Sequence, residues 1–267
     1  MSRVDNAINE IVHIDELAND NQWINKIHPL VKFVITILFI CMVISFDKYN
    51  MTGLVSMSVY PIVLFVICDF SFKGALYRMR FVLPVVCLVG ICNPFLDREI
   101  VTYIGQLPVS NGVVSMCTLI IKGSLCVFAS YILVITTSIE KLCYALRLIH
   151  IPRTIVTIVL LMYRYIYVLV DEMHTILQAY TLRAPGQKGI SIRTWGSLVG
   201  QFMLRSIDRA NEIYDSMCMR GYCGEYKCWQ NERICVRDIL WGIVWGAVII
   251  TLRVMPVFEL VGSLVIR

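Results

Sequence analysis

The sequence predicts an all-α polytopic membrane protein, from its composition and from the distribution of its apolar residues. Of the 267 residues, 58% are hydrophobic and 16% are charged, whereas soluble domains carry about 25% charged residues. The mean hydropathy is +0.71. Apolar segments that approach the roughly 20 residues needed to cross a bilayer recur along the chain. This composition excludes a disordered chain and disfavours a soluble one.

We expect about five transmembrane helices, from the apolar segments at residues 30–46, 51–68, 81–96, 113–137 and 239–260. The first and third segments are short, so they would extend at their ends or thin the bilayer. Prolines are tolerated in such helices where neighbouring helices satisfy the freed backbone groups. The first 28 residues do not resemble a signal peptide, because they are polar and no apolar core precedes Leu30.

The distribution of positive charge predicts which parts of the chain are cytoplasmic. Cytoplasmic loops carry an excess of Lys and Arg, and residues 138–237 contain 13 Lys and Arg against 8 Asp and Glu. All positive loops fall on one side of the membrane if the N-terminus is cytoplasmic. The predicted organisation is a cytoplasmic amphipathic N-terminus (1–29), a four-helix membrane domain (30–137), a cytoplasmic or inner-face region (138–237) and a C-terminal transmembrane helix (238–267).

Residues 151–170 are apolar enough to span the membrane, yet Arg164 lies well inside them. A span here would require a return crossing, and residues 187–204 are poorly suited to one because they contain Lys188, Arg193 and several glycines. No helix breaker separates residues 151–170 from Asp171. We therefore expect one long helix that packs at the inner face and continues into the cytoplasm.

Two long amphipathic helices are predicted in the inner-face region. Apolar residues recur in each at spacings of three and four, which places them on one helix face. The first stripe contains Met173, Leu177 and Tyr180, and the second contains Leu204, Ile207, Ala210, Tyr214 and Met217. We expect the two helices to pack together through these stripes.

Each of these helices ends in an arginine beside a helix breaker. Arg183 and Ala184 precede Pro185-Gly186, and Met219-Arg220 precedes Gly221. A glycine just past a helix end supplies the left-handed residue that closes it, and the helix dipole favours a cation there. The spacing leaves two interpretations open. Both arginines are ordinary helix-end charges, or their guanidinium groups protrude to bind carboxylates or helix-end carbonyls of a partner protein.

The second arginine helix resembles a motif of a known family. Its residues Arg209, Ala210, Tyr214, Met217, Arg220, Gly221 and Tyr222 are similar to the second Ala-Arg-Gly-type motif of the transmembrane T component of energy-coupling factor (ECF) transporters, and above all to the cobalt-type subfamily, CbiQ. Further matches follow in the same order as in that subfamily: Ile14-Asp15 with Leu17-Ala18, His28-Pro29 with Lys32, Thr136-Thr137-Ser138, Leu142, Ala145-Leu146, Ile151-Pro152, and Arg164-Tyr165 with Glu172. The first motif departs from the usual Ala-Arg-Gly or Ser-Arg-Gly, since Ala184 stands where the glycine is expected, and Met219 replaces the alanine of the second.

The resemblance implies a non-catalytic coupling subunit in the prokaryotic inner membrane, with its N-terminus and coupling region cytoplasmic. Its implied partners are two ATP-binding-cassette ATPases, a metal-binding membrane S component of the cobalt type, and the lipid bilayer, with no nucleic acid. Arg183, Arg220 and Gly221, with Ala184 and Met219, would dock the ATPases. ATP would bind the ATPases and not this chain. Cobalt is the expected substrate; nickel or a vitamin stays open.

Other residues point to no catalytic or metal site. No GxxxxGK[ST] phosphate loop occurs, and we find no arrangement suited to hydrolysis. The cysteines at 218, 223, 228 and 235 lack the close pairs typical of zinc sites, and the histidines are dispersed. Arg253 is expected to have a structural role, whereas for Lys122 a subunit contact stays open. A stand-alone secondary transporter is the alternative, although no internal repeat supports it.

Overall fold

The computed structural model describes residues 23–48, 50–68, 80, 84–91, 100–104, 107–185, 189–224 and 235–254. These residues fall into two compact units, which we describe separately. The bundle unit comprises the described residues up to 138 together with 235–254, and the α-hairpin unit comprises those from 139 to 224. The expected helical class is confirmed, with the addition of one short β-hairpin.

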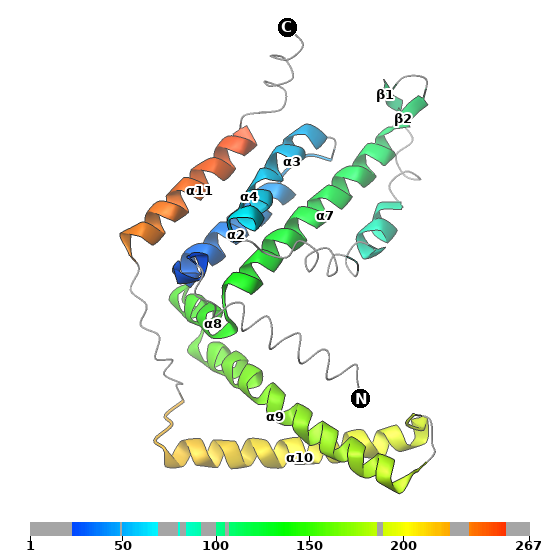
Figure 1. Cartoon of the computed structure of the whole chain (residues 1–267), viewed down its shortest axis with the longest axis vertical. Helices are drawn as coiled ribbons and strands as arrows, with labels where there is room; N and C mark the ends of the chain where they lie inside the picture. Colours follow the sequence, from blue (N-terminus) through cyan, green and yellow to red (C-terminus); the bar gives the residue numbers. More distant parts are fainter. Residues whose placement is uncertain are drawn as a thin grey trace. The chain divides into compact units, whose positions relative to one another are not determined.

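The bundle unit is built from helices that run alongside one another (Figure 1). Its elements are a short 3-10 helix η1 (Ile24–Lys26), α2 (Pro29–Ile44), α3 (Met51–Met57), α4 (Val59–Cys68), the antiparallel strands β1 (Ile100–Ile104) and β2 (Leu107–Ser110), α7 (Asn111–Thr136) and α11 (Val236–Val254). Helix α2 contacts both α7 and α11, and α3 contacts the same two helices. The short helix α4 packs on α7.

The described residues do not confirm the count of five spans. Among the described residues, only α7 and a second helix, α9 (Arg153–Arg183), are long and apolar enough to cross a membrane. Helix α2 and the α3–α4 stretch are apolar but shorter. Helix α11 has 19 residues but includes Arg237, Asp238 and Arg253. Half of the segment at 81–96, and residues 255–260 of the last one, lie outside the described residues.

Polar side chains set the starts of the early helices. The Nδ1 atom of His28 accepts the backbone N–H of Leu30 at 3.2 Å, and Pro29 occupies the first helical position of α2. Proline suits that position because its missing N–H would lack a partner there anyway. Asn50 caps α3 by accepting the N–H of Gly53 at 3.1 Å. The α3–α4 stretch breaks at Ser58, three residues before Pro61, since proline inside a helix removes a hydrogen bond and clashes with the preceding turn.

Aromatic side chains join the helices of the bundle. Tyr60 of α4 stacks on Phe39 of α2 at 4.5 Å and meets Trp245 of α11 edge-on at 5.1 Å. Phe65 of α4 meets Phe128 of α7 edge-on at 5.8 Å. Such pairs add about 0.5–1.5 kcal/mol each beyond the area they bury. They tie three parts of the chain that are distant in sequence into one core.

Two lysines join α2 and α7 reciprocally. The ammonium of Lys32, a buried residue near the start of α2, donates to the carbonyl of Thr136 at the end of α7 at 2.7 Å. In turn, the ammonium of Lys122 in α7 donates to the carbonyls of Phe46 and Ile44 at the end of α2. The last carbonyls of a helix lack intrahelical donors, and cations favour that end of the helix dipole. Each helix therefore caps the other.

Arg253 adds a third cation at the end of α2. Its Nη2 donates to the Ser45 carbonyl at 3.1 Å, and its guanidinium lies 4.0 Å from the centroid of the Phe46 ring. The same ring lies so close to Gly53 that a Cβ at that position would overlap it. These contacts fit the structural role expected for Arg253. The hydrogen bonds of Lys122 to the end of α2 likewise give that lysine a structural role within the chain.

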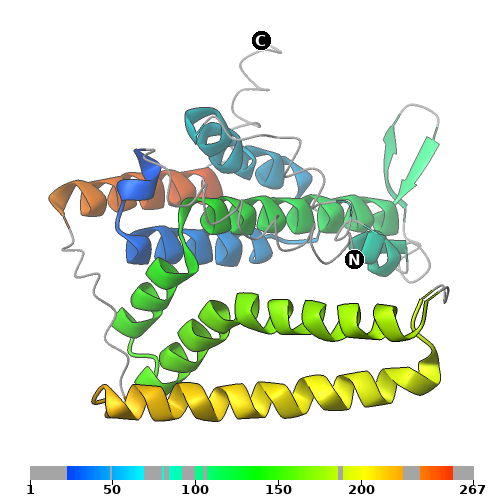
Figure 2. The same ribbon diagram turned by 60° about the horizontal axis from the view of Figure 1, so that its bottom comes forward.

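The α-hairpin unit contains α8 (Ile139–Leu148), α9 and α10 (Ile192–Met219). Cys143 of α8 packs with Val156 and Leu160 of α9 in a small core. Helix α9 runs unbroken from residue 153 to residue 183, as the absence of a breaker predicted. Figure 2 shows α9 and α10 as an antiparallel pair joined beyond the end of α9. A membrane crossing by α9 stays open, because its length and composition permit one.

Candidate functional site

The end of α10 is closed by a complete local hydrogen-bond motif. The N–H of Tyr222 donates to the carbonyl of Met217 at 3.0 Å, and the N–H of Gly221 donates to the carbonyl of Cys218 at 3.0 Å. Gly221 has φ +84, the left-handed conformation that a side chain disfavours. This is the Schellman arrangement, and it places Gly221 at the position expected for it. Arg220 is held just before the turn, with its side chain exposed.

The end of α9 is built differently. Ala184 has φ −125 and donates its N–H to the carbonyl of Tyr180 at 3.0 Å, so no left-handed residue closes the helix there. Gly186, the glycine that follows this helix end in the sequence, lies outside the described residues. Arg183 is the last residue of α9, and its side chain is exposed, as is the neighbouring Leu182 at 82%. Both predicted docking arginines thus end their helices on exposed surface, but only Arg220 is followed by a left-handed turn.

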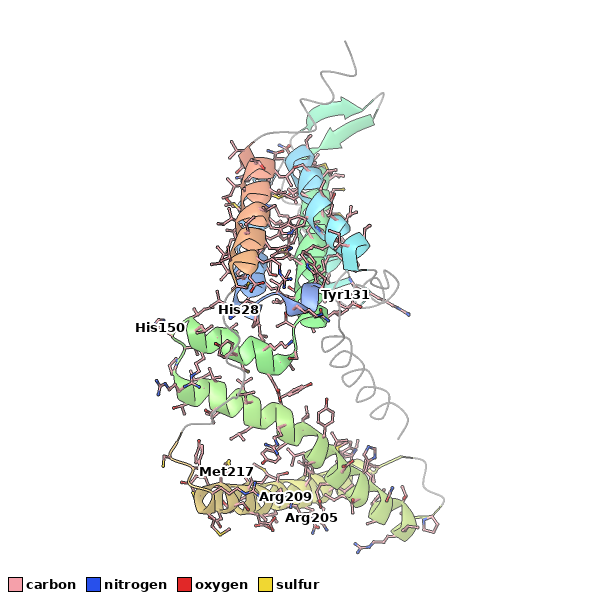
Figure 3. The ribbon with its side chains drawn as sticks, turned by 60° about the vertical axis from the view of Figure 1, so that its left-hand side comes forward. His28, Tyr131, His150, Arg205, Arg209 and Met217 are labelled. Atoms are coloured by element: carbon pink, nitrogen blue, oxygen red, sulfur yellow. The ribbon has the colours of Figure 1, made fainter. Side chains whose placement is uncertain are left out.

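A line of mostly apolar side chains on α10 is less exposed than its other faces, and one ion pair joins α10 to α9. Arg205 of α10 forms an ion pair and hydrogen bond with Glu172 of α9. On α10 the less exposed residues follow a line that includes Leu198, Phe202, Ser206, Ile213 and Met217. Figure 3 shows Arg205, Arg209 and Met217 following one another along this helix. The interface between the two helices therefore contains charged side chains.

Most of the predicted apolar stripe of α10 is exposed and does not pack against α9. Leu204, Ile207 and Tyr214 are 65%, 51% and 56% exposed, and Ala210 is exposed as well. Met217 is half-buried, as are Met173, Leu177 and Tyr180 of α9. Within this chain, the stripe of α10 does not pack against α9. A different line of α10, which includes Leu198, Phe202 and Ile213, is less exposed instead, and Arg205 pairs with Glu172 of α9.

The open stripe is uncharged at physiological pH. Tyr214 is its one titratable residue, and a side-chain hydrogen bond with Cys218 raises the pKa of the phenol above its usual value of 10.0. A phenol with a raised pKa keeps its proton at neutral pH. The exposed face formed by Leu204, Ile207, Ala210 and Tyr214 is therefore an apolar surface, of the kind that marks an interaction site.

A cleft of about 900 Å³ lies between the first half of α9 and the end of α10. Three arginines line it: Arg164 from α9, and Arg209 and Arg220 from α10. The remaining lining residues are Tyr165, Glu212, Ile213, Ser216, Met217, Gly221, Tyr222 and Cys223. The sequence marked Arg164 as a charge inside an apolar run and as part of the resemblance to the family, but it did not connect Arg164 with Arg209. That charge was the available signal, because an arginine in a membrane-capable helix is a functional candidate by default.

Within the part of the chain that the structure describes, no three His, Cys, Asp or Glu side chains gather to hold a metal ion. Of the four clustered cysteines, Cys218, Cys223 and Cys235 are exposed free thiols, and Cys228 lies outside the described residues. The absence of a resident metal or cofactor stays a prediction.

Comparison with known proteins assigns the family. The family described as cobalt transport protein, CbiQ, matches residues 20–229. The chain belongs to this family. Among relatives, the cobalt transport protein CbiQ of Rhodobacter capsulatus is 24% identical over 224 residues, which cover 81% of this chain and 87% of that protein. The energy-coupling factor transporter transmembrane protein EcfT of Ruminiclostridium cellulolyticum is 25% identical over 227 residues, covering 80% and 84%.

A third relative is an uncharacterised protein of Methanocaldococcus jannaschii. It is 26% identical over 148 residues, which cover 54% of this chain and 50% of that protein. The chain thus spans about half the length of this relative. Membership of the CbiQ family makes the chain a membrane component of a transport system and confirms the resemblance seen in the sequence.

Proposed function

We propose that this CbiQ-family chain is the coupling subunit of an ECF-type importer and that the ends of α9 and α10 contact its ATPases. It would transmit ATP-driven motion from two cytoplasmic ATPases to a membrane S component, with cobalt as the substrate. The observation that carries the proposal is that two antiparallel helices each end in an exposed arginine, Arg183 and Arg220. An exposed guanidinium at a fixed helix end suits bidentate binding of a carboxylate on a partner.

The charged helix ends and the apolar face of α10 would bind different partners. The helix ends at Arg183 and Arg220 are charged and would bind the ATPases. Ala184, Met219 and Gly221 would lie beside these contacts. The apolar face of Leu204, Ile207, Ala210 and Tyr214 is exposed and would be covered by the S component, an apolar membrane protein. The positive charge of residues 138–237 supports a cytoplasmic placement of this region at the inner membrane. ATP would bind the ATPases, and this chain would be non-catalytic.

The test replaces the docking arginines one at a time. Arg183→Glu and Arg220→Glu should each weaken co-purification of the ATPases by about tenfold or more, because a charge-assisted bond becomes a repulsion. ATP-driven cobalt uptake should fall with it. Arg205→Gln is the control, since Arg205 lies in the middle of α10 and not at its end, and loss of its partly exposed pair with Glu172 should cost only about 0.2–1 kcal/mol. Wild-type assembly and uptake in both end variants would show that the arginines do not dock the ATPases.

A further inference from the structure

We infer that the first half of α10 lies on an anionic lipid surface through an exposed apolar face. Four side chains form this N-terminal face: Ile192, Trp195, Val199 and Met203. They recur at spacings of three and four residues, so they lie on one side of the helix. Although all four are large and apolar, their exposed fractions are 91%, 52%, 49% and 64%. An exposed apolar surface of this extent marks a contact with a partner.

Within the part of the chain that the structure describes, no other element covers the N-terminal face. Gly196 and Gly200 lie beside it on the helix, and a Cβ added at either glycine would meet no atom within 4 Å. The less exposed residues of this half of α10, Leu198 and Phe202, lie on a neighbouring side of the helix. The α-hairpin unit therefore packs through that side and leaves the N-terminal face open.

The charge of the surrounding sequence identifies the occupant. Residues 184–204 contain two cations, Lys188 and Arg193, and no Asp or Glu. The acidic residues of α10 all lie in its second half, at Asp208, Glu212 and Asp215. An apolar helix face in a cationic, acid-free stretch suits the boundary between the headgroups and the acyl chains of an anionic leaflet. Packing against an apolar protein surface would cover the same side chains but would not require the acids to be absent.

The amphipathic character of this half of α10 also fits a lipid surface. Trp195 belongs to the residue types enriched at membrane–water interfaces, where the indole ring packs on lipid and its N–H stays near water. Ser197 and Gln201 are exposed on the opposite side of the helix and would face water. The chain belongs to a family of membrane transport proteins, so a leaflet is available to it. This contact needs neither the ATPases nor the S component, whose proposed apolar face begins further along α10.

The experiment places the photo-crosslinking residue p-benzoylphenylalanine at position 199 or, as the matched control, at position 201 on the opposite side. The purified full chain is reconstituted into vesicles of phosphatidylcholine and phosphatidylglycerol, and its lipid adducts are quantified by mass spectrometry after illumination. We expect about tenfold more lipid adduct at position 199 than at position 201. Phosphatidylglycerol should be enriched among these adducts about fivefold or more over its share of the vesicle. Combining Lys188→Gln with Arg193→Gln should remove that enrichment.

Three results would overturn the inference. Equal lipid adducts at positions 199 and 201 would show that the N-terminal face is not the lipid contact. Adducts formed mainly with a second copy of the chain would make the face a protein contact. Phosphatidylglycerol present in the adducts only at its share of the vesicle would show that the surface need not be anionic.

A second pair of variants tests the face without a probe at position 199. With the crosslinker at position 203, Val199→Asp should lower the lipid adducts, because a carboxylate would enter the apolar layer, whereas Gln201→Asp should not. Both positions are exposed, so we expect both variants to fold. Unchanged adducts in Val199→Asp would contradict the inference. The vesicles contain neither ATPase nor S component, so a negative result leaves the proposed coupling role untouched.

Discussion

The bundle unit and the α-hairpin unit use their cations in opposite ways. In the bundle, Lys32, Lys122 and Arg253 all donate to backbone carbonyls at or just past helix ends. In the α-hairpin unit, Arg164, Arg209 and Arg220 gather around a cleft instead. A cation that satisfies a helix end holds the fold together, whereas an exposed cation at the surface of a cleft can also contact a partner. Substitutions in the first group should therefore cost stability, and those in the second should cost binding.

The largest effect on stability should come from Lys32. Lys32→Ala removes a buried cation and its stem, and it leaves the Thr136 carbonyl without that donor. The loss of a charge-assisted hydrogen bond and of packing should lower the free energy of unfolding by roughly 3 kcal/mol. Unfolding in mixed micelles, followed by circular dichroism, measures it. Lys32→Arg should recover part of the loss, and a change below about 1 kcal/mol would contradict the capping role.

A smaller loss is expected for Lys122. Lys122→Met keeps the apolar stem but removes the donor to the carbonyls of Phe46 and Ile44. We expect a cost of about 2 kcal/mol in the same unfolding assay. ATPase co-purification should be unaffected once the variant is folded. If a fully stable variant assembled poorly, the result would instead support a role of Lys122 at a contact with another subunit.

The two arginine-bearing helix ends give a matched pair of substitutions. Gly221→Ala places a side chain at φ +84 and should cost about 1–2 kcal/mol of local stability. Ala184→Gly, at φ −125, needs no such conformation and should change stability by about 0.5 kcal/mol or less. Hydrogen exchange in the last turn of each helix would report the difference. Equal losses of stability in the two variants would show that the left-handed residue at the end of α10 does not distinguish it from the end of α9.

A small effect is also expected from Arg205→Gln. The pair between Arg205 and Glu172 is partly exposed, at 49% and 36%, so its loss should cost only about 0.2–1 kcal/mol. The cost should shrink further as salt concentration rises, because exposed pairs are screened. A thermal unfolding series at low and high salt measures this. A large, salt-independent loss would mean that the pair organises the whole α9–α10 interface.

The sequence alone predicted those features that depend on local spacing. Gly221 was assigned to the end of α10 because glycine after a helix has a specific conformational use, and its φ of +84 bears this out. The unbroken helix through residue 183 followed from the absence of a breaker. Periodicity also found an apolar face on α10, but it could not show which face meets α9. The contacts between the helices are long-range, as the pair of Arg205 with Glu172, 33 residues earlier, illustrates.

Long-range contacts account for the other differences. The acceptor of Lys32 is 104 residues away, and that of Lys122 is 76 residues away, so no window of sequence contains both partners. The cleft could not be predicted for the same reason, since Arg164 and Arg209 belong to different helices. The count of five spans stays a prediction, because half of the segment at 81–96 and the end of the last segment lie outside the described residues.

The reciprocal lysines also constrain how the bundle can move. Lys32 lies 14 positions before Phe46, and Lys122 lies 14 positions before Thr136, so the two anchors are separated by about 21 Å along the antiparallel pair. Sliding α2 along α7 in either direction would pull both ammonium groups away from their carbonyls. The two contacts therefore oppose sliding of α2 along α7. We expect the two helices to tilt or shift together.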